Sequence, residues 1–394
     1  MTDRGSAAPL SGRLHGLDAL RAGALLLGIV FHGLLPYVAG FRWIIADRST
    51  SPIASVVVAW AHLFRMPLFL LLAGFFARMS LARKGTWGFA RDRLKRIGLP
   101  LLVFWPIAVV PVVAIAIVYG WLHSIPNPQP APDDPLLLIS PGHLWFLWQL
   151  LGLYAVLLLV RALVTRLDRS RRRDRVGSWL GDLLATPAGV LLASLPHLAA
   201  IALQGWRSFA IEGPATIRPE LAAYLAFGGA FLIGWLLYGR PERLQRIARG
   251  WLGYSLAAGI WTVTWFVMAG PNLPGRRLPM PDLLTGLYGA VGVYLWVYAS
   301  LALAIRFLSG ENSVLRYLAD SSYWLYLLHL GLIGALGLLV ADLPWPWWIK
   351  ITITFTGTVA LLLGSYELLV RHTWVGRWLN GRSFPRRRHG VESG

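Results

Sequence analysis

The chain of 394 residues contains no cysteine, and only 14% of its side chains are charged. Without cysteine it has neither a disulfide framework nor a thiolate metal site, and we expect no bound metal ion. Soluble chains carry about a quarter charged residues, so the scarcity of charge argues against a soluble protein. Apolar residues make up 56% of the sequence, and its mean hydropathy is +0.57. These values predict an integral membrane protein.

Long apolar runs alternate with short polar loops along the chain. A helix needs about 20 mainly apolar residues to cross the hydrocarbon core of a bilayer. The sequence therefore predicts an all-α, polytopic integral membrane protein with about ten transmembrane helices. We expect no cleavable signal peptide, because the first apolar span is too long and contains charged side chains. The predicted spans are 17–40, 53–77, 97–120, 143–165, 187–204, 221–238, 251–269, 284–307, 317–341 and 346–370.

Acidic residues are also scarce, since 18 Asp and Glu stand against 37 Lys and Arg, for a formal net charge of +19. In a soluble protein this excess would suggest a nucleic-acid partner. Here the basic residues gather in alternate loops, with 28 on one side of the predicted spans and 6 on the other. Short cytoplasmic loops are the basic ones. The asymmetry predicts that both termini are cytoplasmic and that the partner is a lipid bilayer, not nucleic acid.

The first predicted span contains Asp18, Arg21 and His32, of which Arg21 and His32 lie farther inside the apolar run. Such groups are costly in hydrocarbon and usually face an internal cavity, so each is a functional candidate. The two are eleven residues apart, close to three helical turns, and therefore share one face about 16 Å apart along the axis. Arg21 is predicted to lie toward the cytoplasm and His32 deeper. The alternative is that Arg21 extends to the headgroups and His32 only packs.

The second and third spans add further charged side chains. His62 and Arg65 are three residues apart and share one helix face. A structural ion pair with another helix is an equal alternative for Arg65. The third span is introduced by RDRLKRIGLP, in which Arg93 and Arg96 carry guanidinium groups suited to phosphate oxygens. A basic cytoplasmic loop alone would also explain this pair.

The fourth span opens with GHLWFLWQLL, which places His143, Trp145 and Trp148 at its outer end. Tryptophan at an interface usually anchors a helix among the headgroups, but its flat apolar face also stacks on sugar rings. The ninth span reads SSYWLYLLH, and its spacing places three polar side chains on one helix face: Ser322, Tyr326 and His329.

Taken in order, these segments resemble the integral-membrane acyltransferase family 3. The opening RLHGLDALRAGALLLGIVFH is similar to the first-helix pattern of that family, in which Arg and His are separated by ten residues. Arg93 and Arg96 match its Arg-x-x-Arg pattern at the third helix. PLFLLLAGFF, HLWFLWQLL and SYWLYLLH resemble its signatures in the second, fourth and ninth helices. Within the family, the sequence is most similar to a subgroup that succinylates osmoregulated periplasmic glucans.

The resemblance implies a multi-pass protein of the bacterial inner (plasma) membrane. Its parts would be a cytoplasmic N-terminus (1–16), an acyltransferase transmembrane domain (17–372) and a basic cytoplasmic tail (373–394). It would move an acyl group, succinyl in that subgroup, from cytoplasmic acyl-CoA to hydroxyls of a periplasmic glucan, with no permanently bound cofactor. The predicted residues are His32, Arg21 and His329 for catalysis; Arg93, Arg96, Arg65, Tyr326 and Ser322 for the donor, succinyl-CoA; and His62, His143, Trp145 and Trp148 for the acceptor.

In the simplest scheme, neutral His32 takes the proton of the attacking hydroxyl while His329 or Arg65 polarises the thioester carbonyl. An acyl-His32 intermediate is the second scheme. A succinyl carboxylate would need a further cation, which Arg65, Arg207 or Arg218 could supply.

A transporter or flippase for a glycan or an organic anion is the alternative function, since anion carriers also place Arg and His within the membrane. The absence of a visible internal repeat counts against it. A structural assembly subunit is a third reading, which fits poorly with the charged stripe on the first span.

Overall fold

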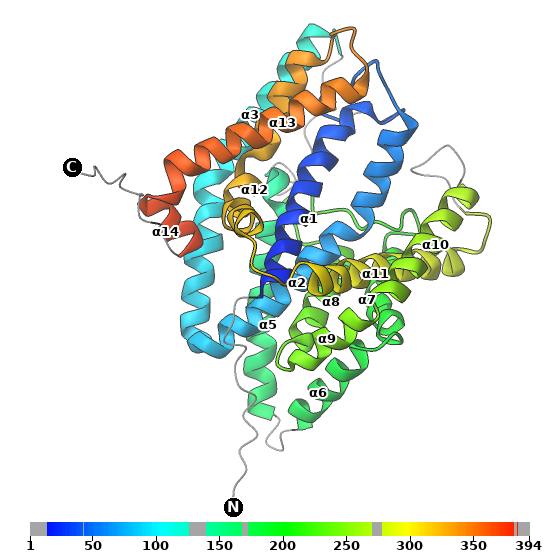
Figure 1. Ribbon diagram of the computed structural model, residues 1–394, viewed down its shortest axis with the longest axis vertical. Helices are drawn as coiled ribbons and strands as arrows, with labels where there is room; N and C mark the ends of the chain where they lie inside the picture. The colour runs from blue at the N-terminus through cyan, green and yellow to red at the C-terminus, as the bar shows by residue number, and fades with distance from the viewer. Residues whose placement is uncertain are drawn as a thin grey trace, which may run out of the picture.

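The computed structural model describes residues 14–41, 43–125, 139–167, 172–269, 278–381 and 384. Every regular element in these ranges is a helix (Figure 1), which confirms the all-α prediction for this part of the chain. The helices are α1 (His15–Leu34), α2 (Pro52–Arg93), α3 (Leu99–Leu122), α5 (Trp145–Leu167), α6 (Arg172–Leu184), α7 (Gly189–Leu203), α8 (Leu221–Leu237), α9 (Pro241–Arg249), α10 (Trp251–Ala269), α11 (Asp282–Phe307), α12 (Ser313–Val340), α13 (Trp347–Ser365) and α14 (Trp374–Asn380), with short helical turns η1 (Leu35–Tyr37), η2 (Leu94–Gly98), η3 (Gly142–Leu144) and η4 (Tyr366–Arg371).

Seven helical stretches of the described chain are long and apolar enough to cross a membrane, or up to nine if two bent helix pairs each form one span. The bent pairs join α6 to α7 at 103° and α8 to α9 at 110°. One of the seven stretches runs from Pro52 to Leu122, 71 residues, which is far longer than one crossing needs. This stretch contains the second and third predicted spans. The molecule is therefore a multi-pass helical protein, while ten spans and cytoplasmic termini stay predictions.

The long α2 helix is interrupted at Gly85, whose backbone has φ 66° and ψ 179°. Glycine adopts a positive φ readily because it has no Cβ to clash with the carbonyl oxygen. The interruption lies between the apolar part of α2 and the basic segment that leads into α3. It allows Arg93 and Arg96 to return toward the helix bundle.

Helices α2 and α8 approach each other closely through two glycines. A Cβ on Gly74 would overlap the backbone oxygen of Phe231, and a Cβ on Gly234 would overlap that of Leu71. Membrane helices associate through such small residues because lipid supplies no hydrophobic force between them. The contact holds α2, which carries His62 and Arg65, against the rest of the bundle.

Helices α1 and α12 lie side by side near the centre of the fold (Figure 1) and run in the same direction. Arg21 of α1 donates to the backbone oxygen of Ala319 at 3.1 Å. Farther along both helices, the rings of His32 and His329 are 5.2 Å apart between centroids. The polar stripes of the first and ninth predicted spans therefore face each other.

The segment that follows α1 and η1 is fastened to α13 by a buried ion pair. Lys350 Nζ lies 2.7 Å from Asp47 Oδ2, and each of these side chains is only 2% exposed. Lys350 also donates to the backbone oxygen of Ala341, while Asp47 Oδ1 accepts the backbone N–H of Ser49. The same segment carries Trp43, whose ring stacks on that of His32 at 5.8 Å.

The predicted tail begins with a helix, α14. The Thr373 hydroxyl accepts the backbone N–H of Val375 and so caps its first turn. The helix packs back onto the bundle, where Trp378 Nε1 donates to the backbone oxygen of Lys95 at 2.8 Å and Asn380 Nδ2 to that of Asp320 at 2.9 Å. Beyond Gly381, only Phe384 of the tail lies within the described residues.

Candidate active site

A cavity of about 930 Å³ runs along α1 between α2, α5 and α12. It reaches from the start of α1 and the end of α14 to the far part of α1 and the start of α5. The helices bring to this one cavity nearly all the residues predicted for the site: Arg21, His32, His62, Arg65, Arg93, Arg96, His143, Trp145, Ser322, Tyr326 and His329.

Four arginines line one end of the cavity, which we call the cationic mouth: Arg21, Arg83, Arg93 and Arg96. Arg21 is 3.2 Å from Asp18 on the preceding turn and also donates to the Ala319 backbone. These contacts hold its guanidinium between α1 and α12. Arg21 is therefore fixed at the mouth instead of extending freely to the headgroups.

A single carboxylate, Asp92, organises the rest of the mouth. It lies 2.6 Å from Lys84, 3.1 Å from Arg93 and 3.1 Å from Arg96, while Arg93 also donates to Ser80. Asp18 and Asp320 also line the cavity, so the four arginines and Lys84 face three carboxylates and leave a net positive site. Sequence reasoning missed Asp92 as an organiser, although its position beside Arg93 in RDRLKR was a visible signal.

The end of α14 forms part of the wall of the mouth. Asn380 and Gly381 line the cavity, and the Asn380 backbone oxygen lies 3.5 Å from Arg96 Nη1. Gly381 has φ 76°, and a Cβ there would overlap the Arg96 guanidinium. No local pattern indicated this contact, because it joins residues nearly three hundred positions apart.

The other end of the cavity contains four histidines, which we call the histidine chamber: His32, His62, His143 and His329. Ring centroids are 5.2 Å apart for His32 and His329 and 5.1 Å for His143 and His329. His62 stacks on Phe31 at 5.3 Å. In the part of the chain that the structure describes, no group of three His, Asp or Glu side chains is placed to hold a metal ion.

Backbone contacts assign the protons of two of these histidines. His329 Nδ1 lies 2.8 Å from the backbone oxygen of Tyr326, and His143 Nε2 lies 3.2 Å from those of Tyr326 and Leu327. A carbonyl only accepts, so these nitrogens carry the hydrogen in the neutral rings. Neutral His329 therefore has its lone pair on Nε2. In that form it accepts hydrogen bonds there, whereas polarising a carbonyl would require the doubly protonated ring.

His32 and His62 have no hydrogen bond among the described residues, and Nδ1 of each is buried without a partner. Buried polar atoms are normally satisfied by protein or water. Both rings line the cavity, so a bound substrate or water can supply the missing partner. Trp43 holds the His32 ring in place by stacking and leaves its nitrogens available.

Arg65 lies beside the histidine chamber and is only 7% exposed. Its guanidinium carbon stands 4.4 Å from the centre of the Phe31 ring, in a cation–π contact. A Cβ on Gly28 would come within 2.7 Å of Arg65 Nη1, so glycine there makes room for the guanidinium. Its Nε is buried without a hydrogen-bond partner.

Comparison with known proteins confirms the family that the sequence resembles. The profile of the acyltransferase 3 family, described as an acyltransferase domain, matches residues 14–367. This chain belongs to that family.

Curated relatives of this acyltransferase include proteins named glucans biosynthesis protein C. The protein of Salmonella typhi is 24% identical over 328 residues, 80% of this chain and 81% of that protein. The protein of Escherichia coli strain SMS-3-5 is 32% identical over 139 residues, 34% of this chain and 35% of that protein. No solved structure matches the chain.

Some side chains of the acyltransferase have contacts that differ from those predicted. Trp148 does not line the cavity, because its indole N–H turns to the backbone oxygen of Ile217 at 3.2 Å. The hydroxyl of Tyr326 donates to the His143 backbone at 2.7 Å, and that of Ser322 to Ala319 at 2.8 Å. Both residues line the cavity, but in this structure their hydroxyl hydrogens are engaged by the protein.

Trp145 remains at the cavity as predicted for the acceptor side, where it stacks on Phe227 with centroids 5.5 Å apart. Its ring leaves no space for a side chain at Gly213, which also lines the cavity. The acyltransferase therefore has a cationic site and a cluster of bases at the two ends of one cavity.

Proposed function

We propose that this membrane acyltransferase moves a succinyl group from cytoplasmic acyl-CoA to a hydroxyl of a periplasmic glucan. The observation that carries the proposal is the single cavity that joins the cationic mouth to the histidine chamber. A reaction with a charged donor on one side of a membrane and a sugar acceptor on the other needs such a passage.

The donor end of the proposal rests on the cationic mouth. Coenzyme A carries phosphates, and guanidinium groups bind phosphate oxygens through two parallel hydrogen bonds. On the predicted orientation, the mouth faces the cytoplasm, where acyl-CoA is made. Arg21 and His32 are about 16 Å apart along α1, a separation that an extended pantetheine arm bridges. The thioester would then lie beside the histidine chamber.

The chemical step is proposed to use neutral His32 as general base. The acceptor hydroxyl gives its proton to an imidazole nitrogen while its oxygen bonds to the thioester carbonyl carbon. The carbon–sulfur bond of the tetrahedral adduct then breaks, and the leaving sulfur takes the proton from His32. The products are an ester and the free thiol of coenzyme A, with no net change in protons. An acyl-His32 intermediate would use the same two ends of the cavity.

The acceptor is proposed from the relatives and from the far end of the cavity. Relatives that align over four fifths of the chain are named for glucan biosynthesis. Trp145 lines the cavity at that end, with Phe227 stacked on its ring, and an aromatic side chain suits the apolar surface of a sugar. On the predicted orientation, this end faces the periplasm, and the protein is proposed to reside in the bacterial inner membrane.

The proposal is tested by His32→Ala in purified protein with radiolabelled succinyl-CoA and a neutral glucan. Loss of a general base lowers the rate of acyl transfer by about 100-fold or more. His123→Ala serves as the matched control, because His123 lies outside the cavity, and should transfer at the wild-type rate. Wild-type transfer by His32→Ala would exclude His32 as the base.

The alternative function, transport of a glycan or an organic anion, is less favoured now that the chain belongs to an acyltransferase family. It predicts movement of glycan or anion into liposomes without any acyl donor. Such movement, together with no acyl transfer by the wild-type protein, would replace the proposal by the alternative.

A further inference from the structure

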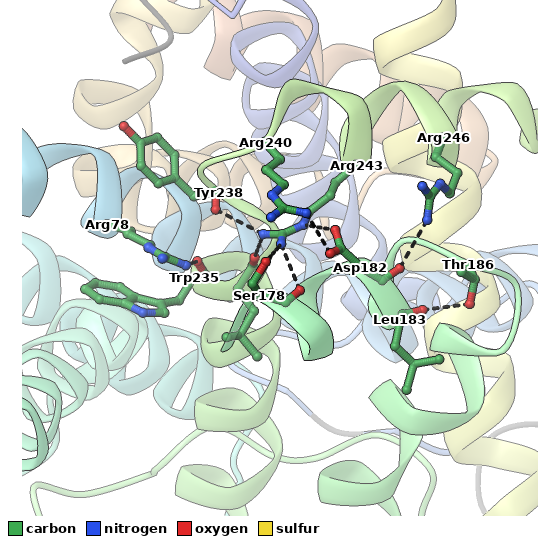
Figure 2. Close-up of polar contacts among 11 residues, drawn as sticks. Arg78, Ser178, Asp182, Leu183, Thr186, Trp235, Tyr238, Arg240, Arg243 and Arg246 are labelled. Carbon is green, nitrogen blue, oxygen red and sulfur yellow. Dashed lines mark hydrogen bonds and ion pairs between the residues drawn. The ribbon is translucent and has the colours of Figure 1, made fainter. Parts of the chain in front are cut away.

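Three Lys and Arg side chains are buried in the described part of the chain, and two of them are fully paired. Lys350 binds Asp47 and a backbone oxygen. Figure 2 shows Arg243 of α9 enclosed by its partners on α6 and α8. Arg243 Nε lies 2.9 Å from Asp182, and its two terminal nitrogens donate to backbone oxygens and to Ser178. Buried cations in this fold are thus normally compensated.

Arg65 is the exception among these three. It makes no ion pair and no hydrogen bond with the described residues, and its guanidinium lies over the face of the Phe31 ring. A buried charge without a partner is energetically costly. Arg65 lines the cavity, so an anion that enters the cavity can supply the missing partner.

The two other cations considered from the sequence are placed elsewhere. Arg207 and Arg218 are exposed, and neither lines the cavity. The structure therefore selects Arg65 from three candidates that were equivalent in the sequence.

We infer that Arg65 binds the terminal carboxylate of the transferred group and thereby selects dicarboxylic acyl donors over monocarboxylic ones. This inference rests on the proposed function, since it assigns the acyl end of the same donor. It gives the first half of α2, which carries Arg65, a role in specificity that is separate from the base chemistry of His32.

The geometry places Arg65 within reach of the reacting carbonyl. Its guanidinium carbon is 4.4 Å from the Phe31 ring centre, and that centre is 5.0 Å from the His32 ring centre. Arg65 and His32 are thus no farther apart than the sum of these distances. A guanidinium–carboxylate hydrogen bond fills about 2.8 Å of the gap, and the short chain between the carbonyl and the carboxylate fills the rest.

Other anions fit Arg65 less well. The phosphates of coenzyme A have the cationic mouth, and Gly28, which packs on Arg65, lies seven residues beyond Arg21 on α1, about 10 Å along the axis. The oxyanion of the tetrahedral adduct is a second possible partner. It forms with every acyl group, whereas a carboxylate is present only on dicarboxylic donors, so a comparison of donors separates the two roles.

The test compares succinyl-CoA with butyryl-CoA, which has the same number of acyl carbons and no carboxylate. The readout is the ratio of their kcat/KM values for transfer to a neutral glucan. Arg65→Met should lower this ratio by about 30-fold or more, the effect of removing one partner of a buried charge pair. Arg207→Met removes an exposed cation outside the cavity and should leave the ratio unchanged.

A second variant keeps the charge and moves it. Gly28→Ala brings a methyl group within 2.7 Å of Arg65 Nη1 and displaces the guanidinium, so the ratio should fall in the same direction. Gly23→Ala, on the same helix with open space around its Cβ, is the matched control. If Arg65→Met does not accumulate as folded protein, Gly28→Ala decides the question.

Three results would overturn parts of the proposal. An equal loss of both donors in Arg65→Met and Gly28→Ala would assign Arg65 to the oxyanion. A wild-type preference for butyryl-CoA would refute carboxylate selection and leave the acyltransferase function standing. Absence of wild-type transfer from either donor would reject the proposed function itself.

Discussion

The buried pair of Asp47 and Lys350 allows a quantitative test of how the histidine chamber is held. The two residues are 303 positions apart, and their side chains meet at 2.7 Å with 2% exposure each. Lys350→Met removes one charge and keeps a similar chain length. Among the described residues, it leaves the buried Asp47 carboxylate with the Ser49 N–H as its remaining hydrogen-bond partner.

The expected loss in the free energy of unfolding follows from the burial of the pair. Removing one partner of a buried ion pair costs about 3–5 kcal/mol, because the other charge stays desolvated. The double variant with Asp47→Asn removes that charge and keeps an acceptor for the Ser49 N–H. The double variant should therefore lose less of the free energy of unfolding, about 1–2 kcal/mol relative to the wild type. The double variant is predicted to be more stable than Lys350→Met alone.

The assay is unfolding in mixed micelles by a denaturing detergent, followed by the fluorescence of the 20 tryptophans. Acyl transfer is measured in parallel, because the fastened segment carries Trp43, which stacks on His32. A loosened segment should lower kcat about tenfold or more, since small misplacements of reacting groups are costly. The reasoning is refuted if the free energy of unfolding of Lys350→Met lies within about 1 kcal/mol of the wild-type value. It is also refuted if the double variant is no more stable than Lys350→Met.

Two further predictions concern packing and the donor. Gly234→Ala forces α2 and α8 apart and should lower the free energy of unfolding, measured in the same micelles, by about 1–3 kcal/mol. Gly259→Ala is the control, because its Cβ would meet open space, and it should leave the free energy of unfolding unchanged. Arg93→Ala combined with Arg96→Ala should raise the Kd for acyl-CoA at least about tenfold in calorimetry. Arg91→Ala is the matched control, because Arg91 is exposed and lies outside the cavity. An unchanged Kd in the variant that lacks both Arg93 and Arg96 would exclude this pair from the donor site.

Much of the site was predictable because the relevant signals are local. The polar side chains of α1 stand out against an apolar background, and the 3.6-residue period places Arg21 and His32 on one face. The same reasoning placed Tyr326 and His329 together on α12. Both stripes line the cavity in the structure. Polar side chains on an apolar membrane helix are costly against lipid, so they usually face the interior of the protein.

The misses concern the direction in which a side chain points around its helix. Trp145 and Trp148 are three residues apart, and both were predicted to face the acceptor, yet only Trp145 lines the cavity. The N–H of Trp148 turns instead to Ile217. Spacing relates two residues on one helix to each other, but the rotation of the helix against its neighbours depends on packing.

By itself, the sequence determined a helical membrane protein of the acyltransferase 3 family, with Arg21 and His32 as misfits on one helical stripe. Only the tertiary structure decided that the stripe faces α12, that the end of α14 lines the mouth, and that Arg65 remains uncompensated while Arg243 and Lys350 are paired. The physical reason is the range of the interactions. Hydropathy and helical period act over neighbouring turns, whereas the carboxylate partners of Arg243 and Lys350 lie 61 and 303 residues away and are set by how the segments pack.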